Sequence, residues 1–149
     1  WGDIIAARED YHHLFATFAT EQPEALMLLE GVEDPRHGAA VDLVAGLIKG
    51  LIEKPEPGQT SARWNQAGLA IYQTSIFSCL RQLQPSPRGE LEFTAAVQML
   101  VERGLLVRGI ALQMPRLHLT RPEDLNRVEA ALTRDGRYGY RIAEIAGDD

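Results

Sequence analysis

Short apolar runs alternate with segments of helical periodicity along this chain, and this alternation is what most narrows its possible folds. Apolar residues recur every three or four positions over residues 8–20, which is typical of a helix with one buried face. Residues 25–29 then form a continuous apolar run, as expected of a strand that is buried on both faces. We therefore expect an α/β fold in which helices pack against a sheet.

Proline and glycine separate the remaining expected elements. Loops are predicted at residues 33–38, 54–63 and 85–89. Further strands are predicted at residues 39–43, 47–52, 64–72, 105–112 and 116–119, and helices at residues 75–83, 91–103 and 122–132. Ala45 and Gly46 mark a turn between two strands, and Gly104 is placed to cap the helix before it. Pro122 suits the first turn of the last helix.

Composition excludes several classes of function. The 149 residues suit one domain, either whole or a fragment. A net charge of −6 without a basic run argues against binding duplex nucleic acid, where phosphate neutralisation dominates affinity. No apolar run approaches the ~18 residues of a membrane span. Cys79 is the only cysteine, which fits a reducing, cytoplasmic setting, and its apolar neighbours favour a buried hydrophobic residue over a nucleophile.

Five short motifs follow one another in a recognisable order. They are GD at residues 2–3, EDPRHG at 33–38, EKP at 53–55, SPRGELE at 86–92 and RPEDL at 121–125. Each motif alone is weak, but their order and spacing over residues 1–132 resemble the C-terminal half of sugar-1-phosphate nucleotidyltransferases, especially the glucose-1-phosphate thymidylyltransferase type. The resemblance implies a partial Rossmann-like, three-layer fold of the nucleotide-diphospho-sugar transferase type, without its N-terminal nucleotide-binding portion.

The resemblance also implies a reaction and a ligand. A sugar 1-phosphate would attack the α-phosphate of a nucleoside triphosphate, usually with Mg²⁺, to give a nucleotide sugar and pyrophosphate. The expected ligands are therefore a sugar 1-phosphate or a nucleotide sugar, and a homo-oligomer is compatible with this reading. A non-catalytic binding or regulatory relative, or a purely structural domain, remains an alternative.

Three residues carry the catalytic expectation. By resemblance, Asp3 is a Mg²⁺ ligand, Lys54 meets the sugar phosphate, and Glu53 accepts hydrogen bonds from sugar hydroxyls. A hard carboxylate oxygen suits Mg²⁺, and an ammonium suits phosphate as a point charge. Neighbouring strand residues point to opposite faces, so Glu53 and Lys54 reach one ligand only if the strand ends or bends near Pro55. The alternatives are a turn-capping role for Asp3 and a solvated ion pair for Glu53 and Lys54.

Four further residues are expected to bind substrate by the same resemblance. Gly38 allows backbone to approach the sugar, Gln66 and Gly68 lie on the strand lining the sugar pocket, and Glu90 frames the sugar site. A plain loop role for Gly38 and a structural role for Glu90 remain open, and Glu92 could cap the following helix.

The sequence also departs from the family pattern. The string Arg116-Leu117-His118 stands where the family has Trp-x-Asp, so His118 occupies the position of the second metal ligand. Imidazole is a poor ligand for Mg²⁺, and a structural role for His118 is an open alternative. Ala70 replaces an aromatic residue and Ala95 an Asp. These changes favour the non-catalytic alternative.

The nucleotide-gripping motif is missing from these 149 residues. The family holds the triphosphate on a Gly-rich loop, whose backbone N–H groups bind phosphate oxygens, and this sequence contains no such loop. A parallel sheet without its first strands would also leave an open edge. We therefore expect the other half in the same polypeptide or in a partner subunit, and the start at Trp1 without Met suggests a fragment or split subunit.

Overall fold

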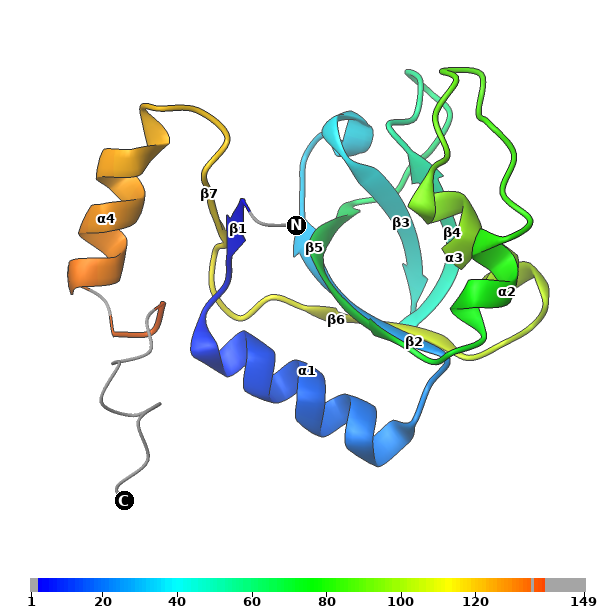
Figure 1. Cartoon of the computed structure of the whole chain (residues 1–149), viewed down its shortest axis with the longest axis horizontal. Helices are drawn as coiled ribbons and strands as arrows, with labels where there is room; N and C mark the ends of the chain where they lie inside the picture. Colours follow the sequence, from blue (N-terminus) through cyan, green and yellow to red (C-terminus); the bar gives the residue numbers. More distant parts are fainter. Residues whose placement is uncertain (1–2, 135, 139–149) are drawn as a thin grey trace.

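The computed structural model describes residues 3–134 and 136–138 and shows helices packed around a closed, five-stranded sheet (Figure 1). The strands of this sheet are β2 (Ala25–Gly31), β3 (Ala39–Val44), β4 (Leu47–Glu53), β5 (Trp64–Tyr72) and β6 (Val107–Ala111), in the order β2-β5-β3-β4-β6. The helices are α1 (Arg8–Glu21), α2 (Ile76–Leu80), α3 (Phe93–Glu102) and α4 (Asp124–Arg134), with a 3-10 turn, η1, at Pro35–His37. The α/β prediction is confirmed.

The sheet is mostly antiparallel. Strand β2 pairs in parallel with β6, whereas β2–β5, β3–β4, β3–β5 and β4–β6 are antiparallel. The expectation of a parallel sheet with an open edge therefore fails for the described residues. The hairpin β3–β4 curls over and meets β6 at Leu47 and Arg108, which closes the sheet.

Strand β2 is the centre of the core. Its residues alternate between two apolar clusters: Ala25, Met27 and Leu29 belong to the one that includes α2 and α3, and Leu26 and Leu28 to the one under α1. All five are buried, and full burial of a leucine stabilises a fold by about 1.5–3 kcal/mol. Burial on both faces explains why this segment is a continuous apolar run rather than an alternating one.

Element boundaries differ from the predictions mainly at helix ends. Helix α4 starts at Asp124 rather than Pro122, because the turn before it is closed by i→i−3 bonds, from the Asp124 N–H to the Arg121 carbonyl and from the Leu125 N–H to the Pro122 carbonyl. Helix α2 spans only five residues, against a predicted span of 75–83. The predicted cap at Gly104 is confirmed, since its φ is 71° and its N–H donates to the Val101 carbonyl.

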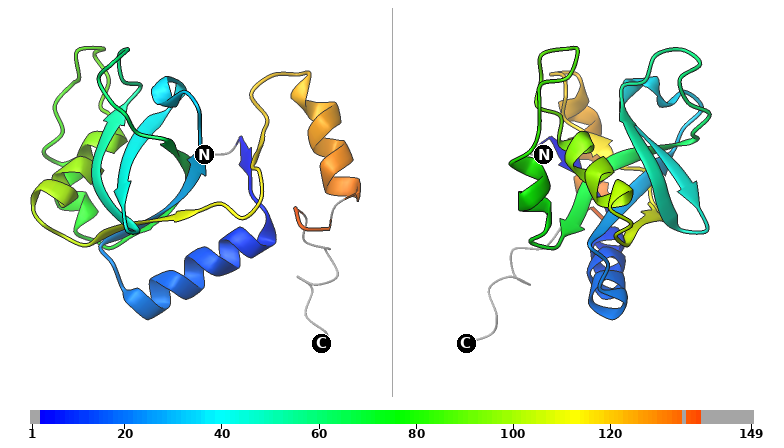
Figure 2. Two further views of the ribbon diagram at one scale, coloured as in Figure 1. Left: turned by 180° about the vertical axis from the view of Figure 1, so that it is seen from behind. Right: turned by 90° about the vertical axis from the view of Figure 1, so that its right-hand side faces the viewer.

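A separate two-stranded ribbon stands beside the closed sheet. Strands β1 (Ile4–Ile5) and β7 (Leu117–His118) pair antiparallel and lie between the sheet and α4 in both Figure 1 and Figure 2. Across residues 3–134 and 136–138, no helix is long and apolar enough to cross a bilayer. The ribbon matters for the site, because it holds the start of the described chain, at Asp3 and Ile4, next to His118 beside the closed sheet.

Candidate functional site

One cavity of about 440 Å³ opens where β1 and β7 meet the ends of β3, β4 and β5. All eight residues singled out from the sequence line it: Asp3, Gly38, Glu53, Lys54, Gln66, Gly68, Glu90 and His118. Residues of the lining that sequence reasoning did not nominate include His37, Phe93, Thr94 and Arg116. The structure thus gathers residues that are far apart in the sequence, with Asp3 and His118 separated by 115 positions.

Lys54 reaches the cavity through an unusual backbone conformation. It follows the last residue of β4 with a φ of 42°, in the left-handed region, and its N–H donates to the Gly38 carbonyl at 3.0 Å. Strand β4 therefore ends where the prediction required, and both Glu53 and Lys54 line one cavity. A non-glycine residue in this region is uncommon and costs energy, which is a mark of functional segments.

The Lys54 ammonium is available to a ligand. It forms no ion pair or hydrogen bond with any described residue, so the predicted alternative of a Glu53–Lys54 ion pair is not found. Glu53 is held instead by Thr94, whose hydroxyl donates to Glu53 Oε2 at 2.6 Å from the first turn of α3. This contact leaves the second carboxylate oxygen of Glu53 to accept from other donors.

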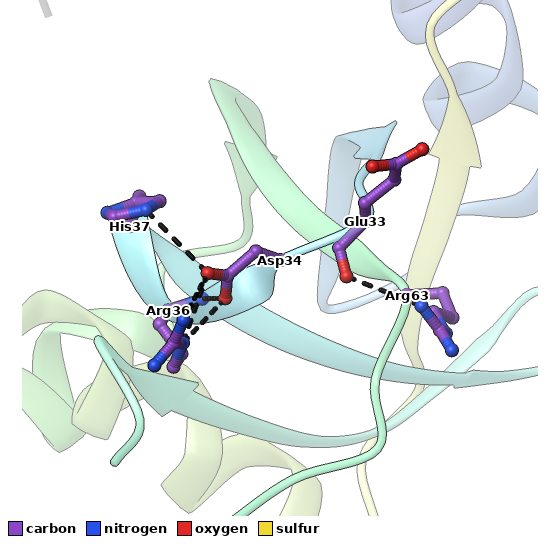
Figure 3. Close-up of polar contacts among 5 residues, drawn as sticks. All are labelled: Glu33, Asp34, Arg36, His37 and Arg63. Atoms are coloured by element: carbon purple, nitrogen blue, oxygen red, sulfur yellow. Dashed lines mark hydrogen bonds and ion pairs between the residues drawn. The ribbon is translucent and has the colours of Figure 1, made fainter. Parts of the chain in front are cut away.

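The loop before β3 is built around Asp34 (Figure 3). The Arg36 guanidinium forms a bidentate ion pair with the Asp34 carboxylate, and the Arg36 backbone N–H donates to Asp34 Oδ1 at 3.0 Å. His37 Nε2 lies 3.7 Å from Asp34 Oδ2. These hydrogen bonds, first from the Arg36 guanidinium and second from the Arg36 backbone N–H, hold the pKa of Asp34 well below its usual range. The loop is therefore fixed at η1 and delivers His37 and Gly38 to the cavity rim.

Gly38 is required by a close approach rather than by a left-handed φ. Its φ is −154°, which any residue adopts, but a Cβ there would lie 2.9 Å from the amide group of Asn65. Asn65 is buried on β5. The glycine therefore lets the loop pack onto β5, and its carbonyl is the acceptor that anchors Lys54.

On the opposite rim, Arg88 organises the acidic loop before α3. Its Nη2 lies 3.0 Å from Glu92 Oε1 and 3.8 Å from Glu90 Oε2. Glu90 is 67% exposed and Glu92 only 16% exposed. Glu92 stands at the N-cap position of α3 but makes no capping hydrogen bond with its side chain, so it serves Arg88 instead.

Gly68 makes room for the two-stranded ribbon. It lies at an irregularity in the β2–β5 pairing with a φ of 87°, and a Cβ there would lie 2.2 Å from Ile4 Cδ1. Arg116 Nη1 is the next neighbour, at 3.8 Å. Gly68 thus seats β1 and the start of β7 against β5, and Gln66 lines the cavity beside it.

The described residues do not fit a Mg²⁺ site of their own. Ile4 pairs with His118, and the Leu119 N–H donates to the Asp3 carbonyl, so Asp3 and His118 lie at one end of the ribbon. Asp3 offers hard oxygen, but imidazole nitrogen suits softer metals. Among the described residues, no group of three or more His, Cys, Asp or Glu is placed to hold a metal.

Comparison with known proteins gives a consistent family picture. Residues 2–113 match the family model described as nucleotidyl transferase. The low-salt glycan biosynthesis nucleotidyltransferase Agl11 of Haloferax volcanii is 31% identical over 125 residues, which is 83% of this chain and 34% of Agl11. The UTP–glucose-1-phosphate uridylyltransferase AglF of the same organism is 30% identical over 118 residues, 77% of this chain and 48% of AglF.

Solved structures agree. A protein described as a putative glucose-1-phosphate thymidylyltransferase from Bacillus anthracis, in complex with a sucrose, is 26% identical to this chain. The two structures superpose with a TM-score of 0.71, over 93% of this chain and 55% of the Bacillus anthracis chain. A UDP-glucose pyrophosphorylase complexed with UDP-glucose shares the fold, with a TM-score of 0.72 over 88% of this chain and 52% of its own, at 17% identity. The chain thus spans about half or less of the relatives it matches.

Proposed function

Because the chain belongs to the nucleotidyl transferase family, we propose that it is the sugar-phosphate-binding part of a sugar-1-phosphate nucleotidyltransferase. One observation supports this most: Lys54, an ammonium with no partner among the described residues, stands beside an oriented carboxylate, Glu53, in one cavity. The ammonium complements a phosphate, and the carboxylate complements the hydroxyls of a sugar. A sugar 1-phosphate carries both groups on adjacent atoms.

The other cavity residues take supporting roles in this proposal. Gly38 and Gln66 border the sugar, Gly68 keeps the ribbon close enough to cover it, and Glu90 accepts from hydroxyls at the open rim. Phosphoryl transfer requires mainly positioning and charge stabilisation, so a rigid sugar site contributes directly to rate. The cytoplasm, where nucleoside triphosphates are made, is the proposed setting.

The grip on the nucleoside triphosphate belongs to sequence beyond these 149 residues or to a partner chain. The support for this is the missing Gly-rich loop and the extra length of the relatives. Asp3 stands at the family's Mg²⁺ position by resemblance and its carboxylate suits that ion, but His118 does not complete the pair. We therefore assign no step of the reaction to a metal held by this chain.

A second candidate function is a non-catalytic relative that binds a sugar phosphate or nucleotide sugar and regulates a partner. His118 at the position of the expected metal ligand favours it. Both candidates use the same cavity and differ only in turnover.

Pyrophosphate release tests the proposal. The full polypeptide encoded by the gene is incubated with a nucleoside triphosphate, glucose 1-phosphate and Mg²⁺. Release above background, reduced by Lys54→Ala and not by Lys49→Ala, supports the enzyme. Lys49 is the matched control because it is an exposed lysine on the same strand, β4. Sugar-phosphate binding without release supports the regulatory relative, and absence of both excludes the two candidates.

A further inference from the structure

Arg116 is the most tightly held cation in the cavity lining. Its side chain is only 14% exposed, and its Nε donates to Glu30 Oε2 at 2.9 Å. Glu30 comes from β2, 86 positions earlier in the chain. Since Glu30 takes the Nε–H, the orientation of the guanidinium is restricted, and within the part of the chain that the structure describes its two terminal nitrogens have no acceptor.

Arg116 lines the cavity, and its Nη1 lies near Gly68 on β5. Nη1 lies 3.8 Å from the Cβ position of Gly68, and neither Nη1 nor Nη2 donates to an acceptor among the described residues. A planar guanidinium edge with two free N–H donors matches the two oxygens of a carboxylate. Arg88, another arginine of the lining, differs because Glu92 and Glu90 already surround it.

Strand order places Arg116 and Lys54 on different sides of the cavity. Arg116 contacts β2 and β5, whereas Lys54 follows β4 and is bonded to Gly38 before β3. In the order β2-β5-β3-β4, two strand spacings separate β5 from β4, or about 10 Å. The two phosphates of a nucleotide sugar are joined directly and therefore both lie at the same end of the sugar. Within a single sugar-phosphate ligand whose phosphate meets Lys54, a second anion that meets Arg116 is therefore carried by the sugar itself.

We propose that Arg116 selects a sugar 1-phosphate whose ring carries a carboxylate away from the phosphate, as in a uronic acid 1-phosphate. This inference rests on the proposed function and specifies the substrate class for the same cavity. Lys54 binds the phosphate, and the Nη1 and Nη2 groups of Arg116 bind the carboxylate. Because Glu30 already offsets the charge of Arg116, the selection comes from the directed pair of hydrogen bonds more than from net charge.

Isothermal titration of the full chain with two ligands tests the inference. Glucuronic acid 1-phosphate is expected to bind about tenfold or more tightly than glucose 1-phosphate, in line with a charge-assisted pair of hydrogen bonds. Arg116→Gln is expected to lower the affinity for the uronic acid about tenfold more than the affinity for glucose 1-phosphate. Arg116→Lys, which keeps the charge but loses the planar fork, is expected to lose most of the preference.

Controls separate selection from folding. Arg116→Gln leaves the Glu30 carboxylate without its ion-pair partner. The double variant Glu30→Gln, Arg116→Gln removes that unpaired charge. The double variant is also expected to lose the preference. Arg121→Gln, at an exposed arginine outside the cavity lining, is expected to keep it. Equal binding of the two ligands by the unmodified chain, or a preference that survives in both glutamine variants, overturns the inference and leaves the proposed function standing. Binding of neither ligand overturns both.

Discussion

The Thr94 hydroxyl donates to the Glu53 carboxylate at 2.6 Å, and this contact ties the first turn of α3 to the last residue of β4. Thr94 is buried, with 8% of its surface exposed. The bond joins two segments that are 41 positions apart and fixes the orientation of the carboxylate that faces the cavity. Glu53 is therefore preorganised, so that a sugar hydroxyl meets it without further ordering of the side chain.

Thr94→Val tests that preorganisation. Valine keeps the shape of threonine but removes the donor, so we expect glucose 1-phosphate to bind about fivefold to tenfold more weakly, which corresponds to about 1 kcal/mol. Calorimetric titration measures the effect. The control is Thr20→Val, since the Thr20 hydroxyl donates to the Ala16 carbonyl within α1, away from the cavity. Equal affinities in the two variants would remove Thr94 from the site.

Gly68→Ala tests how closely the ribbon is seated. We expect a loss of unfolding free energy larger than the roughly 1–2 kcal/mol that a left-handed alanine costs, because the new methyl group would collide with Ile4. Gly58→Ala is the matched control, since Gly58 has a φ of 80° and nothing within 4 Å of its Cβ position. Urea denaturation of both variants gives the comparison. Losses of the same size would mean that the Ile4 contact is not tight.

Asp34 gives a pH-dependent prediction for the loop at the cavity rim. Its pKa is lowered in the folded protein by the side chain and the backbone N–H of Arg36, so the carboxylate stabilises the loop above its unfolded pKa of about 3.9. That contribution is lost only as the pH falls through the lower folded value. We expect amide protection at Arg36 to persist from neutral pH to about pH 4, and to be lost at all pH values in Asp34→Ala, which removes the acceptor. An Asp34 carboxyl that titrates near its ordinary value in NMR would be the opposite finding.

Tyr72 is expected to be replaceable. Its hydroxyl is buried without a hydrogen-bond partner among the described residues, and burial raises the pKa of this phenol above its ordinary value. The ring packs edge-on against the Phe93 ring, with the two ring centroids 5.1 Å apart. Tyr72→Phe removes an unsatisfied donor and keeps the ring, so we expect an unfolding free energy that is unchanged or about 1 kcal/mol higher. A loss of more than about 1 kcal/mol would show that the hydroxyl has a partner.

The sequence predicted the elements better than their arrangement. Local periodicity and Pro–Gly punctuation sufficed for α1, β5 and the β3–β4 turn, because these depend on neighbours within a few positions. The closing contact between Leu47 and Arg108 and the pairing of Arg116 with Glu30 join distant residues, which local patterns do not encode. Gly2, the first residue of the GD motif, lies outside the described residues.

Part of the lining of the candidate site could be nominated from the sequence, through the motifs and the resemblance that they support. Five of the eight nominated residues lie in the short motifs and three, Gln66, Gly68 and His118, follow from the wider resemblance; all eight line one cavity. Thr94 was missed because it falls in none of the motifs, and Arg116 because it stands where the family has a Trp, so that the resemblance gave it no role. One signal for Arg116 was available, since it lies two positions before His118 and so shares a face of the same extended segment.

Binding of a sugar 1-phosphate tests the central claim most directly. Titration of glucose 1-phosphate into the chain is expected to show one site, weakened about tenfold to a hundredfold in Lys54→Ala, as the loss of a charged hydrogen-bond donor predicts. The exposed-lysine control Lys49→Ala is expected to bind like the unmodified chain. Binding that is insensitive to Lys54→Ala, or equally weakened by Lys49→Ala, would contradict the assignment of this cavity as the sugar-phosphate site.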